Sequence, residues 1–249
     1  MKASALTDKG RVRVQNQDTV FMSTSPLGGL PNLFMVADGM GGHQAGDYCS
    51  RTLVGRITEF VGEYPEGAPV RILREAIEEA NVSLFRESMN RPELAGMGST
   101  LTAAVIDGDI LNVFNIGDSR LYVLEEGSDV PRQVTRDHSY VEEMVQAGRM
   151  KRDSELYFMH KNIITRAVGI GPRVDIDAFE VELPGVRAVL ICSDGLTNMV
   201  DDREIGRIIL ANPDPEEAAQ ALIDEANANG GRDNISVVLV LPQGEEAAV

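Results

Sequence analysis

At the stretch Leu33-Phe-Met-Val-Ala-Asp38-Gly-Met-Gly-Gly-His43, an apolar strand ends abruptly in an acid and a run of glycines. The apolar residues before Asp38 are typical of a buried strand. Asp38 is therefore held firmly at the end of that strand. Glycines at positions 39, 41 and 42 leave the neighbouring backbone open to close approach by other groups.

Two familiar nucleotide-binding loops do not fit this stretch. Gly39, Gly41 and Gln44 break the dinucleotide spacing, and Gly41 to Gly46 is followed by Asp47 where a phosphate loop needs lysine. An acid on a glycine turn with no lysine beside it favours a metal carboxylate over a phosphate cradle.

The composition is that of an ordinary globular protein with an excess of acids. The chain has 249 residues, 39 acidic and 23 basic, and a formal net charge of −16. This charge argues against nonspecific binding to nucleic acid or to an anionic membrane, because both need basic surface. Most of the acids are expected to be solvated surface, although an excess also fits a site that neutralises cations. We expect a single domain over residues 1–249, with its core at about 5–241.

The sequence also bears on the compartment. It shows neither a signal-peptide run at the N-terminus nor an apolar stretch of transmembrane length. Cys49 and Cys192 lie far apart, which indicates a reducing compartment and no disulfide framework. We therefore expect a soluble, cytoplasmic protein without a membrane anchor.

Outward from the glycine turn, hydrophobic periodicity predicts two antiparallel groups of strands and two pairs of helices. The strand at 19–23 is expected to pair with 33–36 as a hairpin, and the strands at 99–106, 110–116 and 120–124 as an antiparallel meander. A weakly patterned excursion, 137–166, contains a short helix at 140–147 and a polar stretch at 149–161. The other predicted elements are helices at 47–61, 70–88, 202–210 and 215–228, and strands at 5–10, 174–181, 186–192 and 235–241.

Each sheet needs one face buried on the other sheet and one face covered by helices. The order of elements therefore predicts an α+β fold, a four-layer αββα sandwich of two antiparallel β-sheets flanked by helix pairs.

Three apolar segments end in an acid within a turn, at Asp38, Asp118 and Asp194, while Asp233 and Asp18 each lie at the start of a strand. Acids at strand ends can converge at one rim of a sandwich. Several carboxylates together raise one another's pKa unless cations lie between them. An all-oxygen set without a histidine or cysteine pair favours Mg²⁺ or Mn²⁺ over Zn²⁺.

The alternative is that these acids only make turns. Asp-Gly and Gly-Asp are ordinary turn pairs, and Asp107-Gly-Asp109 is expected to be nothing more. One such pair alone favours a turn, whereas several pairs that each end a hydrophobic strand favour a site.

Eight short motifs, in order, resemble those of the bacterial metal-dependent serine/threonine phosphatases of type 2C, from about residue 5 to 241. They are Arg13-Val-Gln-Asn16-Gln-Asp18, Val36-Ala-Asp38-Gly39-Met40-Gly41-Gly42-His43, Gly98-Ser-Thr-Leu-Thr102, Asn115-Ile-Gly-Asp118-Ser-Arg120, Thr135-Arg-Asp-His138, Ile164-Thr-Arg166, Cys192-Ser-Asp194-Gly195-Leu196 and Arg232-Asp233-Asn234. Eight motifs in the correct order make the resemblance specific.

The resemblance implies the αββα sandwich with a two-metal centre, Mn²⁺ or Mg²⁺, between the sheets, and a third, weaker metal. A hydroxide that bridges two metals would attack phosphorus in line, without a phosphoenzyme. The matched positions imply that Asp38 bridges both metals, Gly39 offers its carbonyl to the second, Asp194 and Asp233 complete the first, Asp118 binds the third, Asp18 supports the first, and Asn234 orients the ligand loop.

Arg13 matches the arginine that holds the phosphate in a planar two-pronged contact, against the alternative of an exposed arginine on a turn. Animal and plant relatives have histidine directly after the Asp-Gly pair, whereas this chain has Met40 there and His43 three residues on. His43 is a candidate to protonate the leaving alkoxide, to shape the glycine turn, or to do neither. His138 and His160 are expected to be structural or surface residues.

The resemblance predicts a phosphatase that acts on phosphoserine and phosphothreonine in proteins and counteracts a bacterial serine/threonine kinase, with that kinase and its substrates as partners and a monomeric state. It identifies 137–166 as a flap beside the site, which we expect to influence the choice of phosphoprotein. A cysteine-dependent mechanism does not fit, because Gly55 and Asn198 stand where it needs an arginine six residues after Cys49 or Cys192. The rival hypotheses are a non-enzymatic binder of phosphoproteins and a phosphatase of small molecules.

Overall fold

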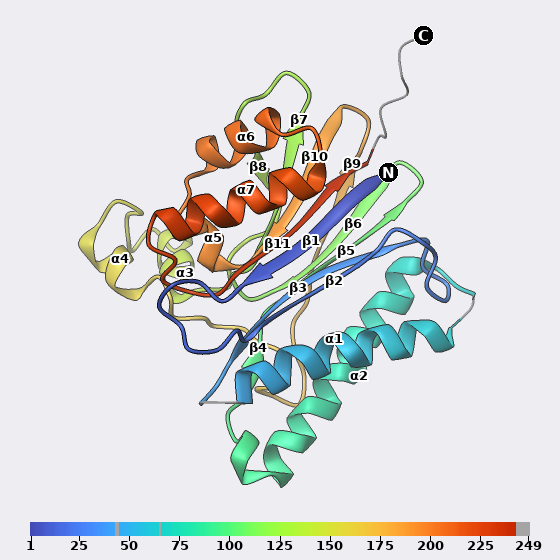
Figure 1. Cartoon of the computed structure of the whole chain (residues 1–249). Helices are drawn as coiled ribbons and strands as arrows, with labels where there is room; N and C mark the ends of the chain where they lie inside the picture. The colour runs from blue at the N-terminus through green and yellow to red at the C-terminus, as the bar shows by residue number, and fades with distance from the viewer. Residues whose placement is uncertain (43–44, 65, 243–249) are drawn as a thin grey trace.

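The structure of the chain, a computed structural model, describes residues 1–42, 45–64 and 66–242. Its strands form two antiparallel sheets that lie face to face (Figure 1). The first sheet has the order β1 (Lys2–Asp8), β11 (Ile235–Leu241), β10 (Val186–Cys192), β7 (Arg120–Glu125) and β8 (Arg132–Gln133). The second has the order β2 (Asp18–Ser23), β3 (Leu33–Met40), β5 (Leu101–Asp107), β6 (Ile110–Ile116) and β9 (Asp177–Glu182), with β4 (Gly98–Ser99) paired to the end of β3.

A pair of helices covers the outer face of each sheet (Figure 1). Helices α1 (Ala45–Glu63) and α2 (Pro69–Asn90) pack on the second sheet, and α6 (Asp202–Ala211) and α7 (Pro215–Ala228) on the first. Helices α3 (Tyr140–Gln146) and α4 (Glu155–His160) lie at one end of the sandwich, and the shorter elements are α5 (Asp194–Thr197) and a 3₁₀ turn at Pro92–Leu94. The predicted αββα sandwich is therefore confirmed. None of the described helices is long and apolar enough to cross a membrane.

Alternation along the strands produces three layers of core. In β3, Met35 and Ala37 face α1 and α2, whereas Phe34 and Val36 face the opposite sheet. Strand β10 shows the same alternation, because Leu190 packs against α6 and α7 whereas Val189 packs between the two sheets. Because side chains on a strand point alternately to opposite faces, a strand covered on both sides reads as a continuous apolar run.

Capping residues explain where two of the outer helices begin. The carboxylate of Asp201 accepts a hydrogen bond from the Glu204 backbone N–H, and that of Asp214 accepts from the N–H groups of Glu216 and Glu217. Pro215 then occupies the first turn of α7, where its missing N–H costs no helical hydrogen bond.

The predicted three-stranded meander is wrong. Strands β5 and β6 pair as expected, but β7 leaves them and pairs with β10 and β8 in the other sheet. The chain crosses between sheets at Gly117, whose φ of 102° lies in the left-handed region that favours glycine. The apolar pattern does not distinguish the two arrangements, because β7 is buried on both faces in either sheet.

Smaller differences between the predicted and the observed elements concern where strands and helices begin, end or are interrupted. The predicted strand at 99–106 is interrupted at Thr100, which separates β4 from β5, and the first strand begins at Lys2 instead of at residue 5. The polar stretch at 149–161 contains α4, a helix that its weak pattern did not predict. The hairpin of β2 with β3 and the short helix after residue 140 are confirmed.

Candidate active site

Pairing of β2 with β3 brings the first two acids together. Asp18 stands directly opposite Asp38 in the register of these strands. The backbone N–H of Gly39, the next residue, donates to the carbonyl of Gln17 over 3.0 Å. A Cβ atom at Gly39 would lie 2.1 Å from the carbonyl oxygen of Gly46, so glycine is required for this close approach.

Thr100 connects Asp38 to the loop that carries Asp118. Its hydroxyl oxygen accepts the Asp38 backbone N–H over 3.0 Å, and its own N–H donates to the Asp38 carbonyl over 2.9 Å. The same hydroxyl lies 2.7 Å from the hydroxyl of Ser119. Thr100, at the break between β4 and β5, thus connects the two predicted metal-binding loops that carry Asp38 and Asp118.

Asp18 is held by two serines of the other sheet. The hydroxyls of Ser193 and Ser236 donate to Asp18 Oδ2 over 2.8 and 2.7 Å. Ser193 directly precedes Asp194, so this contact brings the end of β10 to the start of β2 across the sandwich. Asp18 therefore joins the two sheets at the rim where the acids lie.

Asp233, before β11, forms an ion pair with Arg13. A terminal nitrogen of the Arg13 guanidinium lies 2.7 Å from Asp233 Oδ2. The side-chain amide of Asn234 accepts from the Gln17 N–H over 2.9 Å and donates to the carbonyls of Lys9 and Gln15, each over 2.9 Å. Asn234 therefore holds the loop that carries Arg13 against the start of β11.

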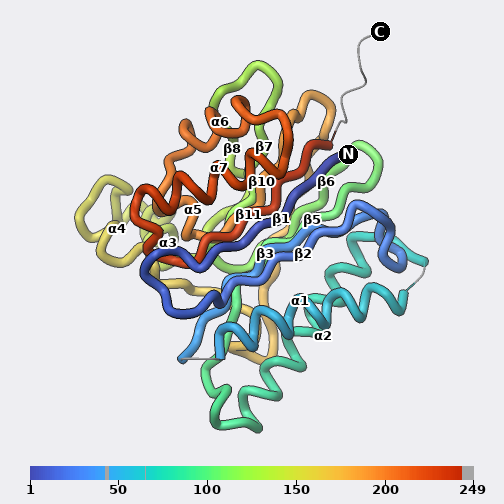
Figure 2. The backbone as a smooth tube through the Cα atoms, in the orientation of Figure 1, coloured from blue at the N-terminus to red at the C-terminus, as the bar shows by residue number. Residues whose placement is uncertain are grey.

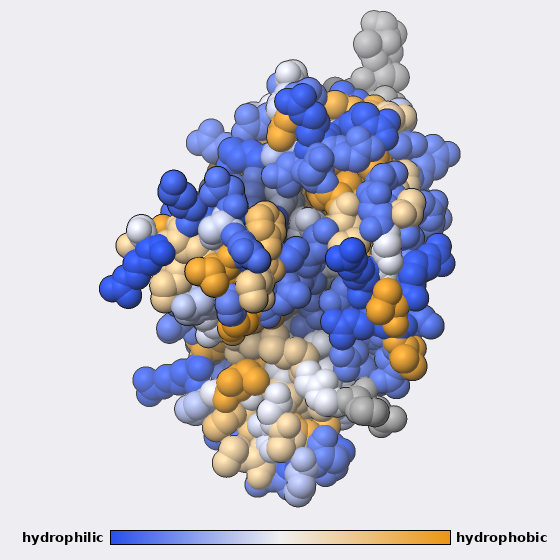
Figure 3. Space-filling model, turned by 90° about the vertical axis from the view of Figure 1, so that its left-hand side faces the viewer, coloured by the Kyte–Doolittle hydropathy of each residue, from blue (hydrophilic) through white to orange (hydrophobic). Residues whose placement is uncertain are grey.

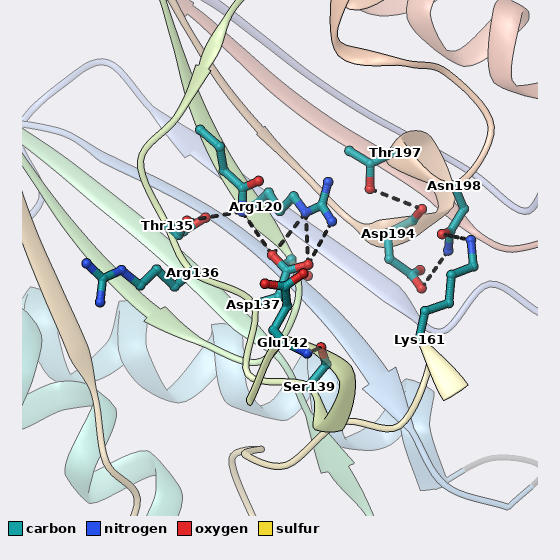
Figure 4. Close-up of polar contacts among 12 residues, drawn as sticks. Arg120, Thr135, Arg136, Asp137, Ser139, Glu142, Lys161, Asp194, Thr197 and Asn198 are labelled. Carbon is teal, nitrogen blue, oxygen red and sulfur yellow. Dashed lines mark hydrogen bonds and ion pairs between the residues drawn. The ribbon is translucent and has the colours of Figure 1, made fainter. Parts of the chain in front are cut away.

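Asp194 begins the short helix α5, where the sequence predicted only a turn. The side-chain amide of Asn198, one turn later, donates to Asp194 Oδ2 over 2.9 Å. Its oxygen accepts from Lys161 Nζ over 2.6 Å, and Lys161 directly follows α4 (Figure 4). A chain of hydrogen bonds thus runs from the flap to Asp194.

The turn that carries Asp118 is held by a buried histidine. His138 Nδ1 accepts the Gly117 backbone N–H over 3.0 Å, which leaves the proton on Nε2, 3.1 Å from Asp177. Arg166 donates to the other oxygen of Asp177 over 2.8 Å. His138 is therefore a structural residue, as expected, and it fixes the turn directly before Asp118.

Burial and mutual repulsion shift the pKa values of these acids upward. Burial is the main cause and raises the pKa of Asp18 to about 7 and that of Asp194 to about 6, with Asp233 adding to both. The pKa values of Asp38 and Asp118 also rise well above the ordinary value, again mainly through burial, with Asp194 adding to both. Burial and the crowding of carboxylates therefore disfavour the charged forms of these acids unless a cation lies between them.

The donor set fits a hard divalent cation. Among the described residues, Asp18 Oδ1 and Asp118 Oδ1 are buried oxygens without a hydrogen-bond partner. Within the same part of the chain, no three His, Cys, Asp or Glu side chains are placed to hold one ion by themselves. Water and backbone carbonyl oxygens would complete the coordination, as is common for Mg²⁺.

The remaining sulfur and imidazole groups take no part in this cluster. Burial raises the thiol pKa of both Cys49 and Cys192 to about 12, so neither provides a thiolate nucleophile. His160 lies on α4, where its Nδ1 is 3.0 Å from the Leu156 carbonyl. His43 lies outside the described residues, and its part in catalysis remains a prediction.

Sequence reasoning named the acids but missed the groups that hold them. Thr100 and Ser193 lie in motifs that predicted no role for their hydroxyls, although a hydroxyl can both donate and accept hydrogen bonds near an acid. Nothing in the sequence paired Ser236 with Asp18 or Lys161 with Asn198, because these contacts join segments far apart in the chain.

Comparisons with known proteins agree with this architecture. The family model described as Protein phosphatase 2C matches residues 10–228. The serine/threonine phosphatase stp of Listeria innocua is 37% identical over 246 residues, which cover 96% of this chain and 95% of that protein. The serine/threonine protein phosphatase PstP of Mycobacterium tuberculosis is 33% identical over 96% of this chain and 44% of its own length.

Solved structures are similar over nearly the whole chain. A crystal structure of a bacterial serine phosphatase has a TM-score of 0.89 at 30% identity and covers 99% of this chain and 100% of that one. The catalytic domain of PstP in complex with two manganese ions has a TM-score of 0.81 at 33% identity, with 96% of each chain covered. The chain therefore belongs to the protein phosphatase 2C family of bacterial serine/threonine phosphatases.

Proposed function

We propose that this protein uses Mn²⁺ or Mg²⁺ to hydrolyse phosphoserine and phosphothreonine in proteins. The observation that carries the proposal is the convergence of acids from both sheets at one rim, beside an arginine that contacts one of them. The relatives named serine/threonine phosphatase and the manganese-bound structure support the substrate and the metal.

The residues proposed to hold the metals follow from the family match and from their placement. When bound, such ions would lower the pKa of a water molecule to provide a hydroxide nucleophile and would neutralise charge on the phosphoryl oxygens. Asp38 would serve both ions of the core site, the Gly39 carbonyl the second, and Asp194 and Asp233 the first. Asp118 is proposed for a third, weaker ion, and Asp18, held by Ser193 and Ser236, supports the first.

Arg13 is the proposed phosphate-binding residue. Its side chain is half-exposed, and the nitrogen that contacts Asp233 is only one part of its planar fork. The remaining N–H groups can donate to two phosphoryl oxygens at once, which lysine cannot reproduce. Asn234 keeps the backbone of this loop in place through Gln15 and Gln17, so the guanidinium is positioned before substrate arrives.

We place the enzyme in the cytoplasm as a monomer that reverses the action of a bacterial serine/threonine kinase, with the kinase and its targets as substrates. Two free, buried cysteines are compatible with a reducing compartment. Light scattering tests the monomer, and release of phosphate from an autophosphorylated kinase domain tests the partner.

The decisive experiment measures phosphate release from a phosphothreonine peptide with Mn²⁺, with Mg²⁺ and with chelator. We expect metal-dependent release that falls by at least about 1,000-fold in Asp38→Ala, because a shared metal ligand is lost. Asp107→Ala is the matched control, since Asp107 also ends a strand but lies in an exposed turn. Folded protein that releases no phosphate under any metal would refute the proposal. Faster release from sugar or nucleotide phosphates than from the peptide would point to a small-molecule phosphatase.

A further inference from the structure

A groove of about 1060 Å³ runs from Arg13 along the outer side of the active-site rim. Four segments line it, namely the loop between β1 and β2, the glycine turn after β3, the start of α1, and the residue after α2 with the 3₁₀ turn that follows. We call it the arginine groove, after Arg13, Arg51 and Arg91. It lies apart from the smaller pocket under the flap, whose lining includes Asp118, Asp194 and Lys161.

The groove is locally basic in a chain of net charge −16. Its lining has three arginines against two acids, Asp47 and Glu93. Arg51 contacts Asp47 over 2.7 Å, and Arg91 contacts Glu93 over 2.9 Å. Ion pairs this exposed contribute only about 0–1 kcal/mol each, so an incoming carboxylate can share or replace either acid.

Tyr48 holds Arg91 in the groove. The guanidinium lies 5.2 Å from the centre of the Tyr48 ring, and a terminal nitrogen donates to the tyrosine hydroxyl over 3.3 Å. Stacking on an aromatic face orients the planar fork, so that a carboxylate that displaces Glu93 can meet its edge.

The same groove offers apolar contact beside Arg13. Val12 and Val14 are among the most exposed large hydrophobic side chains of the described residues, at 65% and 89% of their surface. Exposed apolar side chains next to paired charges are typical of a surface that binds a partner. Figure 1 shows the loop that carries them at the same end of the molecule as the flap helices.

We propose that the arginine groove binds the segment of the substrate protein on one side of the phosphorylated residue and selects aspartate or glutamate there. The inference rests on the proposed function, because Arg13 would hold the phosphate while Arg51 and Arg91 bind the acidic side chains. It gives this phosphatase a preference for phosphorylation sites flanked by acids on one side.

The test compares two phosphothreonine peptides of equal length, one with glutamates beside the phosphorylated residue and one with glutamines. With Mn²⁺, the wild type is expected to show a kcat/KM about 3- to 10-fold higher for the glutamate peptide, which is the scale of two exposed ion pairs. The preference should arise from glutamates on one side of the phosphothreonine only and should shrink between 50 and 500 mM salt, concentrations chosen because exposed pairs are screened.

Arg51→Gln combined with Arg91→Gln should abolish the preference and leave turnover of the glutamine peptide and of a small aryl phosphate unchanged. Arg51→Glu combined with Arg91→Glu should instead favour a peptide with lysines in the same positions. Arg71→Gln is the matched control, because Arg71 is also on a helix, pairs with an acid four residues away, and is 66% exposed against 65% for Arg51.

The outcomes separate this inference from the proposed function. Absence of hydrolysis of the aryl phosphate and of both peptides would refute the proposed function itself. The proposed role of the groove alone would be overturned by hydrolysis of both peptides at equal kcat/KM. It would also be overturned by a preference for the glutamate peptide that survives the double substitution. A gain seen solely with a second phosphate group, and not with glutamate, would also overturn it.

Discussion

The rim of the sandwich and the flap lie side by side, yet they are built in different ways. The rim acids Asp38, Asp118, Asp194 and Asp233 lie in or next to strands β3, β6, β10 and β11, whose residues are mostly buried. Hydroxyls and backbone groups of both sheets contact the rim. The flap, residues 137–166, carries exposed apolar side chains instead, including Leu156, Phe158 and Met159. Figure 3 shows that hydrophobic side chains gather on this end of the molecule.

Side-chain pairs, not a core, hold much of the flap together. Glu142 accepts from Arg152 over 2.6 Å and from the Tyr157 hydroxyl over 2.8 Å. At its base, the guanidinium of Arg120 forms a two-pronged contact with Asp137 (Figure 4). Lys161 is the flap's hydrogen-bonded link toward Asp194.

The two regions therefore differ in what stabilises them. Burial on both sheet faces stabilises the strands that carry the acids, whereas side-chain pairs stabilise much of the flap. The tube view in Figure 2 shows the flap as an excursion beside the layered strands.

The largest contrast should appear in stability. Phe34 is 1% exposed between the sheets and Phe158 is 62% exposed on the flap. Phe34→Ala should lower the free energy of unfolding by about 3–5 kcal/mol, and Phe158→Ala should change it by less than about 0.5 kcal/mol. Urea unfolding followed by circular dichroism measures both, with Phe34→Leu as a milder variant. Equal costs would mean that the flap folds as part of the core.

The link between the two regions should have an intermediate effect on metal binding. Asn198→Ala removes the donor to Asp194, so the Mn²⁺ concentration for half-maximal activity should rise about 10- to 100-fold, as for other partners of metal ligands. Lys161→Met removes the contact with Asn198 and a positive charge that lowers the pKa of Asp194, and it should have a smaller effect. Lys151→Met, at an exposed position of the same flap, is the matched control. If Lys161→Met had the larger effect, the charge of the lysine would matter more than the hydrogen bond from Asn198.

The last prediction concerns how the stability of the metal-free protein depends on pH. The pKa of Asp18 rises to about 7 in the fold, so the folded state keeps a proton that the unfolded chain releases near pH 4. The contribution of Asp18 to the free energy of unfolding should therefore be highest below about pH 4 to 5. It should fall by at least about 1 kcal/mol as the pH rises through 7.

Urea unfolding of chelator-treated protein between pH 5 and 8 tests this slope. Asp18→Asn should flatten it, and saturating Mn²⁺ should reduce it, because a bound cation stabilises the ionised acids. Stability that increases with pH over this range in the metal-free wild type would contradict the raised pKa.

Much of the fold could be read from the chain, for identifiable reasons. Apolar runs such as 33–36 and 235–241 are long enough to indicate buried strands, and the helix at 70–88 has a clear amphipathic period. The placement of β7 could not be read, because a strand that is buried on both faces shows a continuous apolar run that suits either sheet. Helix α4 was missed because it lacks a buried face, and none of its residues is buried.

The amino-acid sequence alone was enough to predict the layered fold and to single out the strand-end acids as candidates, because both signals are local features of the chain. The groups that hold those acids emerged only in the folded structure. The contacts of Asp18 with Ser193 and Ser236, of Asp194 through Asn198 with Lys161, and of Arg13 with Asp233 join segments that are distant in sequence. Such contacts depend on strand register and on the crossing between sheets, and a one-residue shift of either would point the same side chains elsewhere.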